Sequence, residues 1–193
     1  MILETPHGPA QIHLQLVEGA SRVLVLGHGA GGGVGAPDLK AAAETANGEG
    51  VSVVLVEQPY RVAGRKSPAS APQLDAAWTA VCAQLPVESG VQLLVGGRSS
   101  GARVACRTAA DAGAAGVLCL AFPLHPPGRP EKTRLGELEA VTVPVLIVQG
   151  ESDPFGMPPE APRRTVVKLR GNHSLRSDVN GLREAVRAFL QQG

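Results

Sequence analysis

The sequence predicts an α/β fold: a mostly parallel central sheet with helices on both faces and no cap domain. Short apolar runs rich in valine and leucine alternate with segments of helical spacing over all 193 residues, which we expect to form one domain, 1–193. Most of these runs are nearly continuous in apolar residues, as strands covered on both faces of a parallel sheet require. Aromatic residues make up only 3% of the chain, so we expect a core built mainly from Val, Leu and Ala.

The expected elements follow one another in βα order. Residues 12–16 alternate apolar and polar side chains, which predicts a half-exposed strand. Further strands are expected at 22–26, 51–56, 91–95, 117–121, 143–148 and 165–169, and helices at 38–47, 72–85, 99–112 and 178–191. Asp178 is the expected N-cap of the last helix. The two long loops, 58–72 and 123–135, are too short to build a lid, so we expect an open site.

The bulk properties exclude several classes of function. A net charge of +1 gives no electrostatic basis for binding nucleic acid or an anionic membrane. The three cysteines, Cys82, Cys106 and Cys119, share no C-x-x-C spacing, which favours free thiols in a reducing compartment and no metal site. Neither a signal peptide nor an apolar run long enough for a membrane span is present, so we expect a cytoplasmic protein without a cofactor.

The most informative motif is Gly97-Arg98-Ser99-Ser100-Gly101, which directly follows the apolar run at 91–95. It fits G-x-S-x-G between a strand and a helix, the pattern called a nucleophile elbow. In such a turn the serine has a strained backbone, and the flanking glycines relieve crowding against neighbouring chain. The pattern predicts that Ser99 is a nucleophile held at a helix N-terminus, where a developing anion is stabilised.

Two further residues lie where partners of Ser99 belong. Asp153 follows the strand at 143–148 and precedes a proline, and Glu151 is the alternative carboxylate nearer the strand. His173 lies between the last expected strand and the last helix. The chain order Ser, Asp, His is that of the elbow's usual triad, so we expect His173 to accept the proton of Ser99 and Asp153 to orient the imidazole.

A glycine-rich loop at 27–33 follows an early strand and predicts an oxyanion hole. Such loops supply one backbone N–H to the tetrahedral intermediate, and the residue after the nucleophile supplies another. This nominates the N–H groups of Ala30 and Ser100, with Gly31 as the alternative to Ala30. We expect His28 to tie the loop together rather than to transfer protons.

The same loop also fits G-x-G-x-x-G, the dinucleotide-binding fingerprint, and Glu57 lies near the position of a ribose-binding acid. Residues 33–37, Gly-Val-Gly-Ala-Pro, are a poor helix start, however, whereas the fingerprint places the pyrophosphate on a helix N-terminus. A nucleotide-binding protein would also leave the elbow, Asp153 and His173 unexplained.

Taken together, these motifs resemble the α/β-hydrolase superfamily over nearly the whole chain. The resemblance is narrower to its small, lidless dienelactone-hydrolase-like branch. It is carried by the elbow, the loop at 27–32 and the segments Phe-Pro-Leu-His-Pro-Pro-Gly (122–128), Gln-Gly-Glu-Ser-Asp-Pro-Phe-Gly (149–156) and Gly-Asn-His-Ser (171–174). True dienelactone hydrolases have a cysteine nucleophile where this chain has Ser99, which speaks against a dienelactone substrate.

We therefore expect a serine hydrolase that cleaves a small ester, thioester or amide through an acyl-enzyme. The alternative from another class is an α/β-hydrolase fold that serves as an interaction module without turnover. Candidate substrate contacts are Gly31 in the glycine-rich loop, Tyr60 in the loop at 58–72, Arg98 in the elbow and His125 in the loop at 123–135. The expected partner is a small-molecule substrate.

Overall fold

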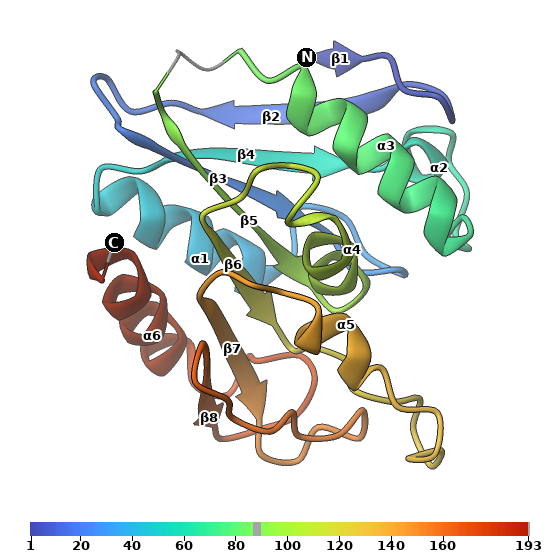
Figure 1. Ribbon diagram of the computed structural model, residues 1–193, viewed down its shortest axis with the longest axis vertical. Helices are drawn as coiled ribbons and strands as arrows, with labels where there is room; N and C mark the ends of the chain where they lie inside the picture. The colour runs from blue at the N-terminus through green and yellow to red at the C-terminus, as the bar shows by residue number, and fades with distance from the viewer. Residues whose placement is uncertain (87–89, 193) are drawn as a thin grey trace.

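The computed structural model describes residues 1–86 and 90–192 (Figure 1). Within these residues, one eight-stranded sheet has the order β1-β2-β4-β3-β5-β6-β7-β8. The strands are β1 (Ile2–Leu3), β2 (Ala10–Gln15), β3 (Arg22–Gly27), β4 (Ser52–Glu57), β5 (Gln92–Arg98), β6 (Gly116–Leu120), β7 (Val145–Gly150) and β8 (Arg164–Leu169). The pairs β1–β2 and β2–β4 are antiparallel and all others are parallel. The mostly parallel sheet that the apolar runs predict is confirmed.

The helices cover both faces of this sheet. They are α1 (Pro37–Gly48), α2 (Pro59–Val62), α3 (Ala71–Ala83), α4 (Ser100–Thr108), α5 (Leu135–Glu139) and α6 (Val179–Gln191). Helices α1 and α6 pack against each other on one face, and α3, α4 and α5 lie on the other (Figure 1). No helix in the described residues is both long and apolar enough to cross a membrane.

Strand β3 is apolar from Val23 to Leu26 because helices cover both of its faces. Val23 and Val25 pack in the cluster beneath α3 and α4, whereas Leu24 and Leu26 pack in the cluster beneath α1 and α6. Successive side chains of a strand point to opposite faces, so a strand covered on both faces needs apolar residues at every position. Helix α6 needs only one apolar stripe, and Asp178 begins it by accepting the Gly181 N–H at 2.9 Å.

Three short elements were not predicted, and one helix is shorter than expected. Strand β1 has two residues, while α2 and α5 have four and five, too few for a periodic pattern to register. Helix α2 lies within the loop at 58–72 and α5 begins at the end of the loop at 123–135, and neither loop adds a layer over the sheet within the described residues. The helix expected at 99–112 is α4, which ends at Thr108 in a series of turns closed by Gly113 at a φ of 64°.

The cysteines are free thiols. Cys106 and Cys119 are buried with their sulfur atoms 3.5 Å apart, and burial together with this contact raises the pKa of Cys119. Cys82 is partly exposed, but its thiol group is buried, and this burial raises the pKa of the thiol to about 12. Cys82 and Cys119 therefore remain protonated at neutral pH.

Candidate active site

Ser99 stands at a sharp turn between β5 and α4. Its backbone has a φ of 51° and a ψ of −110°, a conformation that is costly for a residue with a side chain. Its N–H donates to the carbonyl oxygen of Leu120 at 2.9 Å, which ties the turn to the end of β6. A Cβ on Gly97 would stand 2.5 Å from the carbonyl oxygen of Gly27, and one on Gly101 would collide with that same carbonyl. The tight turn therefore requires glycine at both positions.

His173 lies in the loop between β8 and α6, and its ring reaches Ser99. The distance from His173 Nε2 to Ser99 Oγ is 2.9 Å. The ring of Phe155 lies over the imidazole, with the ring centres 4.3 Å apart and the planes tilted by 33°. This packing holds the histidine ring in one orientation beside the serine.

Asp153 is the carboxylate that bonds this histidine. Its Oδ2 lies 2.8 Å from His173 Nδ1, and its side chain is only 1% exposed. Two further donors hold the carboxylate: Gln149 Nε2 at 2.8 Å and the backbone N–H of Phe155 at 2.9 Å. Glu151, the alternative carboxylate, is exposed to solvent. An ionised Asp153 accepts from Nδ1–H, which leaves Nε2 free to accept the proton of Ser99.

Gln149 is a buried part of the site that sequence reasoning missed. Besides Asp153, its amide nitrogen lies within 3.1 Å of the Phe122 carbonyl and 2.9 Å of the Gly156 carbonyl. It thereby joins the ends of β6 and β7 to the loop that carries Asp153. A signal was present, because Gln149 is a polar residue in an otherwise apolar strand.

The glycine-rich loop after β3 is fixed through its carbonyl groups. The Gly29 carbonyl accepts from His28 Nδ1 at 2.8 Å and from the Gly32 N–H at 3.2 Å, and the Ala30 carbonyl accepts from the Tyr60 hydroxyl at 3.0 Å. In a trans peptide the C=O and the following N–H point in opposite directions, so these bonds also aim the N–H groups of Ala30 and Gly31. Within the described residues, neither of these N–H groups donates to another protein group.

His28 ties the loop to the neighbouring strand, as the sequence predicts. Its Nε2 accepts from the backbone N–H of Gln58, which follows β4, at 3.1 Å. With Nε2 an acceptor, Nδ1 must carry the hydrogen that it donates to the Gly29 carbonyl. Burial lowers the pKa of His28, which keeps the ring neutral and preserves both bonds.

The second amide expected in the oxyanion hole belongs to Ser100, the first residue of α4. In the described part of the chain, its N–H donates to no protein group. It lies at the N-terminus of the helix, where unpaired N–H groups favour a negative charge. The structure therefore leaves N–H groups without protein partners at both positions where the sequence predicts the hole, Ala30 and Ser100.

The remaining predicted site residues have partners within the protein. Tyr60 is buried, and burial raises the pKa of its hydroxyl, which stays a donor to Ala30 at neutral pH. The guanidinium of Arg98 bonds Asp38 and the backbone carbonyl of His173. His125 bonds the carbonyl of its neighbour Pro126 through Nδ1 at 2.9 Å and packs against Gly156.

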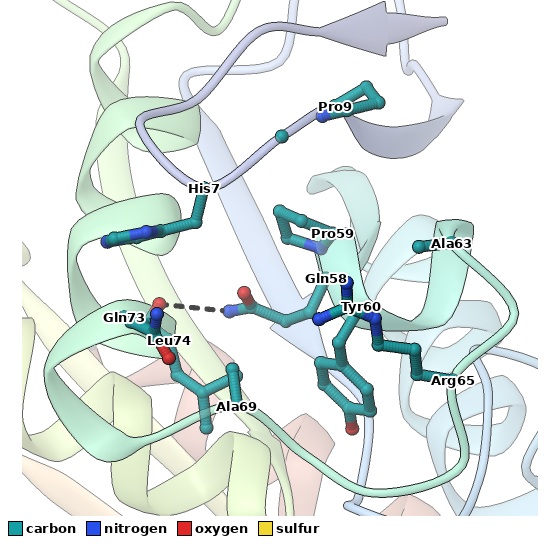
Figure 2. A pocket seen from close by; sticks show the side chains of 11 residues that line it. His7, Pro9, Gln58, Pro59, Tyr60, Ala63, Arg65, Ala69, Gln73 and Leu74 are labelled. Carbon is teal, nitrogen blue, oxygen red and sulfur yellow. Dashed lines mark hydrogen bonds between the residues drawn. The ribbon is translucent and has the colours of Figure 1, made fainter.

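Two crevices flank the glycine-rich loop. The first, with about 560 Å³ of empty space, lies between the β1–β2 loop, α2 and α3 and is lined by His7, Pro9, Tyr60 and Leu74 among others (Figure 2). None of its lining residues is Ser99, Asp153 or His173. The second, with about 940 Å³ of space that is partly open solvent, lies between residues 31–38 and 174–176 and is lined also by Arg98. Its lining, too, includes none of Ser99, Asp153 and His173. Within the described residues, no three His, Cys, Asp or Glu side chains gather as a metal site would require.

Comparisons with known proteins agree with this architecture. A family model described as an alpha/beta hydrolase domain matches residues 20–179. No curated protein sequence matches the chain significantly. Among solved structures, Est1E from Butyrivibrio proteoclasticus, with ferulic acid bound, superposes with a TM-score of 0.80 at 18% identity, covering 100% of this chain and 98% of that one.

Two other solved structures are similar over the whole chain. A serine hydrolase without a lid from Xanthomonas campestris has a TM-score of 0.77 at 21% identity, covering 100% of this chain and 93% of that one. Dienelactone hydrolase from Anabaena variabilis has a TM-score of 0.72 at 16% identity, covering 100% and 94%. These matches confirm the predicted fold class, and the family model confirms the resemblance to the α/β-hydrolase superfamily.

Proposed function

The chain belongs to the alpha/beta hydrolase family, and we propose that it is a serine hydrolase that cleaves a small ester, thioester or amide. The observation that carries this proposal is a continuous hydrogen-bonded series: Ser99 Oγ to His173 Nε2 at 2.9 Å, and His173 Nδ1 to Asp153 Oδ2 at 2.8 Å. A nucleophile, a base and an orienting carboxylate at these distances are what acyl transfer through serine needs.

In the first half of the proposed reaction, Ser99 Oγ attacks the carbonyl carbon of the substrate while His173 Nε2 takes the serine proton. Asp153 stabilises the imidazolium that forms. The carbonyl oxygen becomes an oxyanion, and the N–H groups of Ala30 and Ser100 donate to it, with Gly31 as the alternative to Ala30. The tetrahedral intermediate then collapses, His173 gives its proton to the leaving group, and the acyl group stays on Ser99.

The second half repeats these steps with water. His173 takes a proton from the water molecule as the water oxygen attacks the acyl carbon of the ester on Ser99. The same N–H groups stabilise the second oxyanion. His173 then returns a proton to Ser99 Oγ, the carboxylic acid is released, and the enzyme is ready for another substrate.

A fluorophosphonate probe tests the nucleophile directly, because it reacts with an activated serine and loses fluoride. We expect the wild type to be labelled and Ser99→Ala to be unlabelled. Ser100→Ala is the matched control, since it removes the neighbouring hydroxyl but keeps the N–H, and it should label like the wild type. Absence of labelling in the wild type, or equal labelling of Ser99→Ala, would contradict the proposal and favour a non-catalytic role.

The substrate that we propose has a small acyl group. The site has no lid among the described residues, and the crevice lined by Arg98 and Ser174, the chain neighbours of Ser99 and His173, is open to solvent. We therefore expect little apolar surface for a long chain. Turnover of p-nitrophenyl acetate, butyrate and decanoate measures this preference, and we expect kcat/KM to be highest for the two short esters. A ferulate ester belongs in the panel because Est1E is seen with ferulic acid.

A further inference from the structure

Arg98 immediately precedes Ser99 and bonds to parts of the site from distant segments. Its Nε donates to Asp38 Oδ2 at 2.7 Å, and one of its terminal nitrogens donates to the backbone carbonyl of His173 at 3.2 Å. No other donor in the described residues reaches this carbonyl. Arg98 is thus a direct link between the turn that carries the serine and the backbone of the histidine.

Asp38 anchors the guanidinium from the first turn of α1. Its side chain is only 1% exposed, and its other oxygen accepts the Leu39 N–H at 2.9 Å. Burial raises the pKa of Asp38, and the charge of Arg98 opposes that rise. A carboxylate that is buried, paired and bonded to its own helix has little freedom, so it fixes the direction of the arginine.

Arg98 also packs against the glycine-rich loop. A Cβ on Gly29 would stand 2.9 Å from one terminal nitrogen of Arg98 and 3.6 Å from Ser99 Cβ. The guanidinium therefore lies against the backbone of Gly29, one residue before Ala30. Through this contact and the bond to His173, one side chain adjoins the serine turn, the histidine loop and the oxyanion loop.

We propose that Arg98 is a positioning residue that sets the placement of His173 relative to Ser99, with Asp38 holding its guanidinium in place. This role rests on the proposed hydrolase function and replaces a direct contact of Arg98 with the substrate. Arginine suits the position because its planar fork serves two partners at fixed angles, whereas a lysine ammonium offers a single centre. A reaction that depends on geometry at 2.9 Å loses rate steeply when the base moves.

The first test measures kcat and KM of Arg98→Gln, Arg98→Lys and Asp38→Asn with p-nitrophenyl acetate. We expect kcat to fall by about 10- to 100-fold in Arg98→Gln and by less in Arg98→Lys, with KM changed by less than about threefold. Asp38→Asn should cost less than Arg98→Gln. The double variant should be no slower than Arg98→Gln alone, because Asp38 acts through Arg98.

Arg107 provides the matched control on helix α4. Its guanidinium makes two bonds to Asp75, at 2.8 and 2.6 Å, and its side chain is 18% exposed compared with 22% for Arg98. Arg107 also bonds Glu137 at 3.3 Å, so Arg107→Gln loses ion pairs with two carboxylates, neither of which bonds Ser99, Asp153 or His173. We expect its kcat to stay within about twofold of the wild type, and an equal loss in both variants would reduce Arg98 to a stability role.

Crystal structures of Arg98→Gln and Arg107→Gln give a readout that does not need turnover. We expect the His173 Nε2 to Ser99 Oγ distance to exceed about 3.5 Å in Arg98→Gln and to stay in hydrogen-bond range in Arg107→Gln. If Arg98→Gln does not fold, Arg98→Lys takes its place. An unchanged distance with unchanged kcat overturns the positioning role, whereas a changed distance in a protein that never turns over substrate overturns only the proposed hydrolase function.

Discussion

The two halves of the candidate active site differ in how their polar groups are bonded. In the proton-transfer half, the carboxylate of Asp153 receives three donors, from His173, Gln149 and the Phe155 N–H. In the oxyanion half, the N–H groups of Ala30 and Ser100 donate to no protein group in the described residues. The carboxylate of the first half is thus fully bonded within the protein, whereas the second half has N–H groups without protein partners in the described residues.

This difference follows from what each half would do in the proposed reaction. A base that must receive a proton at one atom works best when its other atoms are already bonded and oriented. An oxyanion hole needs N–H groups that are not already hydrogen-bonded. The peptides that carry them are therefore fixed by hydrogen bonds to their carbonyl groups instead. His28 bonds the Gly29 carbonyl and so holds the peptide of the Ala30 N–H, whereas Tyr60 bonds the Ala30 carbonyl and so holds the peptide of the Gly31 N–H, the alternative donor.

The largest expected effect comes from breaking the proton-transfer half at Asp153. In Asp153→Asn the amide can donate to Nδ1 of His173, which favours the tautomer with hydrogen on Nε2, and that atom can no longer accept from Ser99. We expect kcat for p-nitrophenyl acetate to fall by about 10³- to 10⁴-fold. Glu151→Gln is the control, because it neutralises an exposed carboxylate two residues away, and it should keep kcat within about twofold. Similar losses in both variants would mean that Asp153 is not the orienting carboxylate.

A smaller effect is expected from breaking the support of the oxyanion half. Tyr60→Phe keeps the buried ring and removes only the hydroxyl that bonds the Ala30 carbonyl. The peptide between Ala30 and Gly31, which carries the N–H of the alternative oxyanion donor Gly31, then gains freedom. If Gly31 donates to the oxyanion, we expect kcat to fall about three- to tenfold, as the loss of one hydrogen bond implies. KM should change little, because the bond matters most when the oxyanion forms. A rise in KM at constant kcat would instead assign Tyr60 a direct contact with the substrate.

The sequence predicts the two halves unequally well. Ser99, Asp153 and His173 each follow a strand at the same edge of the sheet, so chain order and strand ends are enough to place them together. The tight turn at Ser99 could be predicted because it requires glycine at positions 97 and 101, where a side chain would collide with neighbouring backbone. These inferences depend on local geometry, which short motifs encode.

The supporting contacts could not be predicted because they join residues far apart in the chain. Tyr60 reaches Ala30 across 30 residues, and Arg98 reaches Asp38 across 60 and His173 across 75. Each depends on which strands are neighbours, here β4 beside β3 and β3 beside β5, and no motif states that order. The sequence therefore offers Tyr60 and Arg98 as candidate substrate contacts, but it does not indicate the bonds of their polar atoms to Ala30, Asp38 and His173.

The support of the oxyanion half should also depend weakly on pH, because it requires a neutral His28. Burial lowers the pKa of His28 below its ordinary 6.5, so near that pH the unfolded chain binds this proton more readily than the folded protein does. Stability from this residue is therefore complete above about pH 6.5 and is lost as the pH falls from there toward the folded-state pKa. For one proton the free energy of unfolding changes by at most about 1.4 kcal/mol per pH unit.

Urea unfolding measures this free energy between pH 7.5 and 5.5, and we expect it to change less with pH in His28→Asn than in the wild type. The control is His7→Asn, a variant of an exposed histidine, which should show the same pH dependence as the wild type. An equal pH dependence of the unfolding free energy in all three proteins would show that His28 binds its proton equally well in the folded and unfolded states.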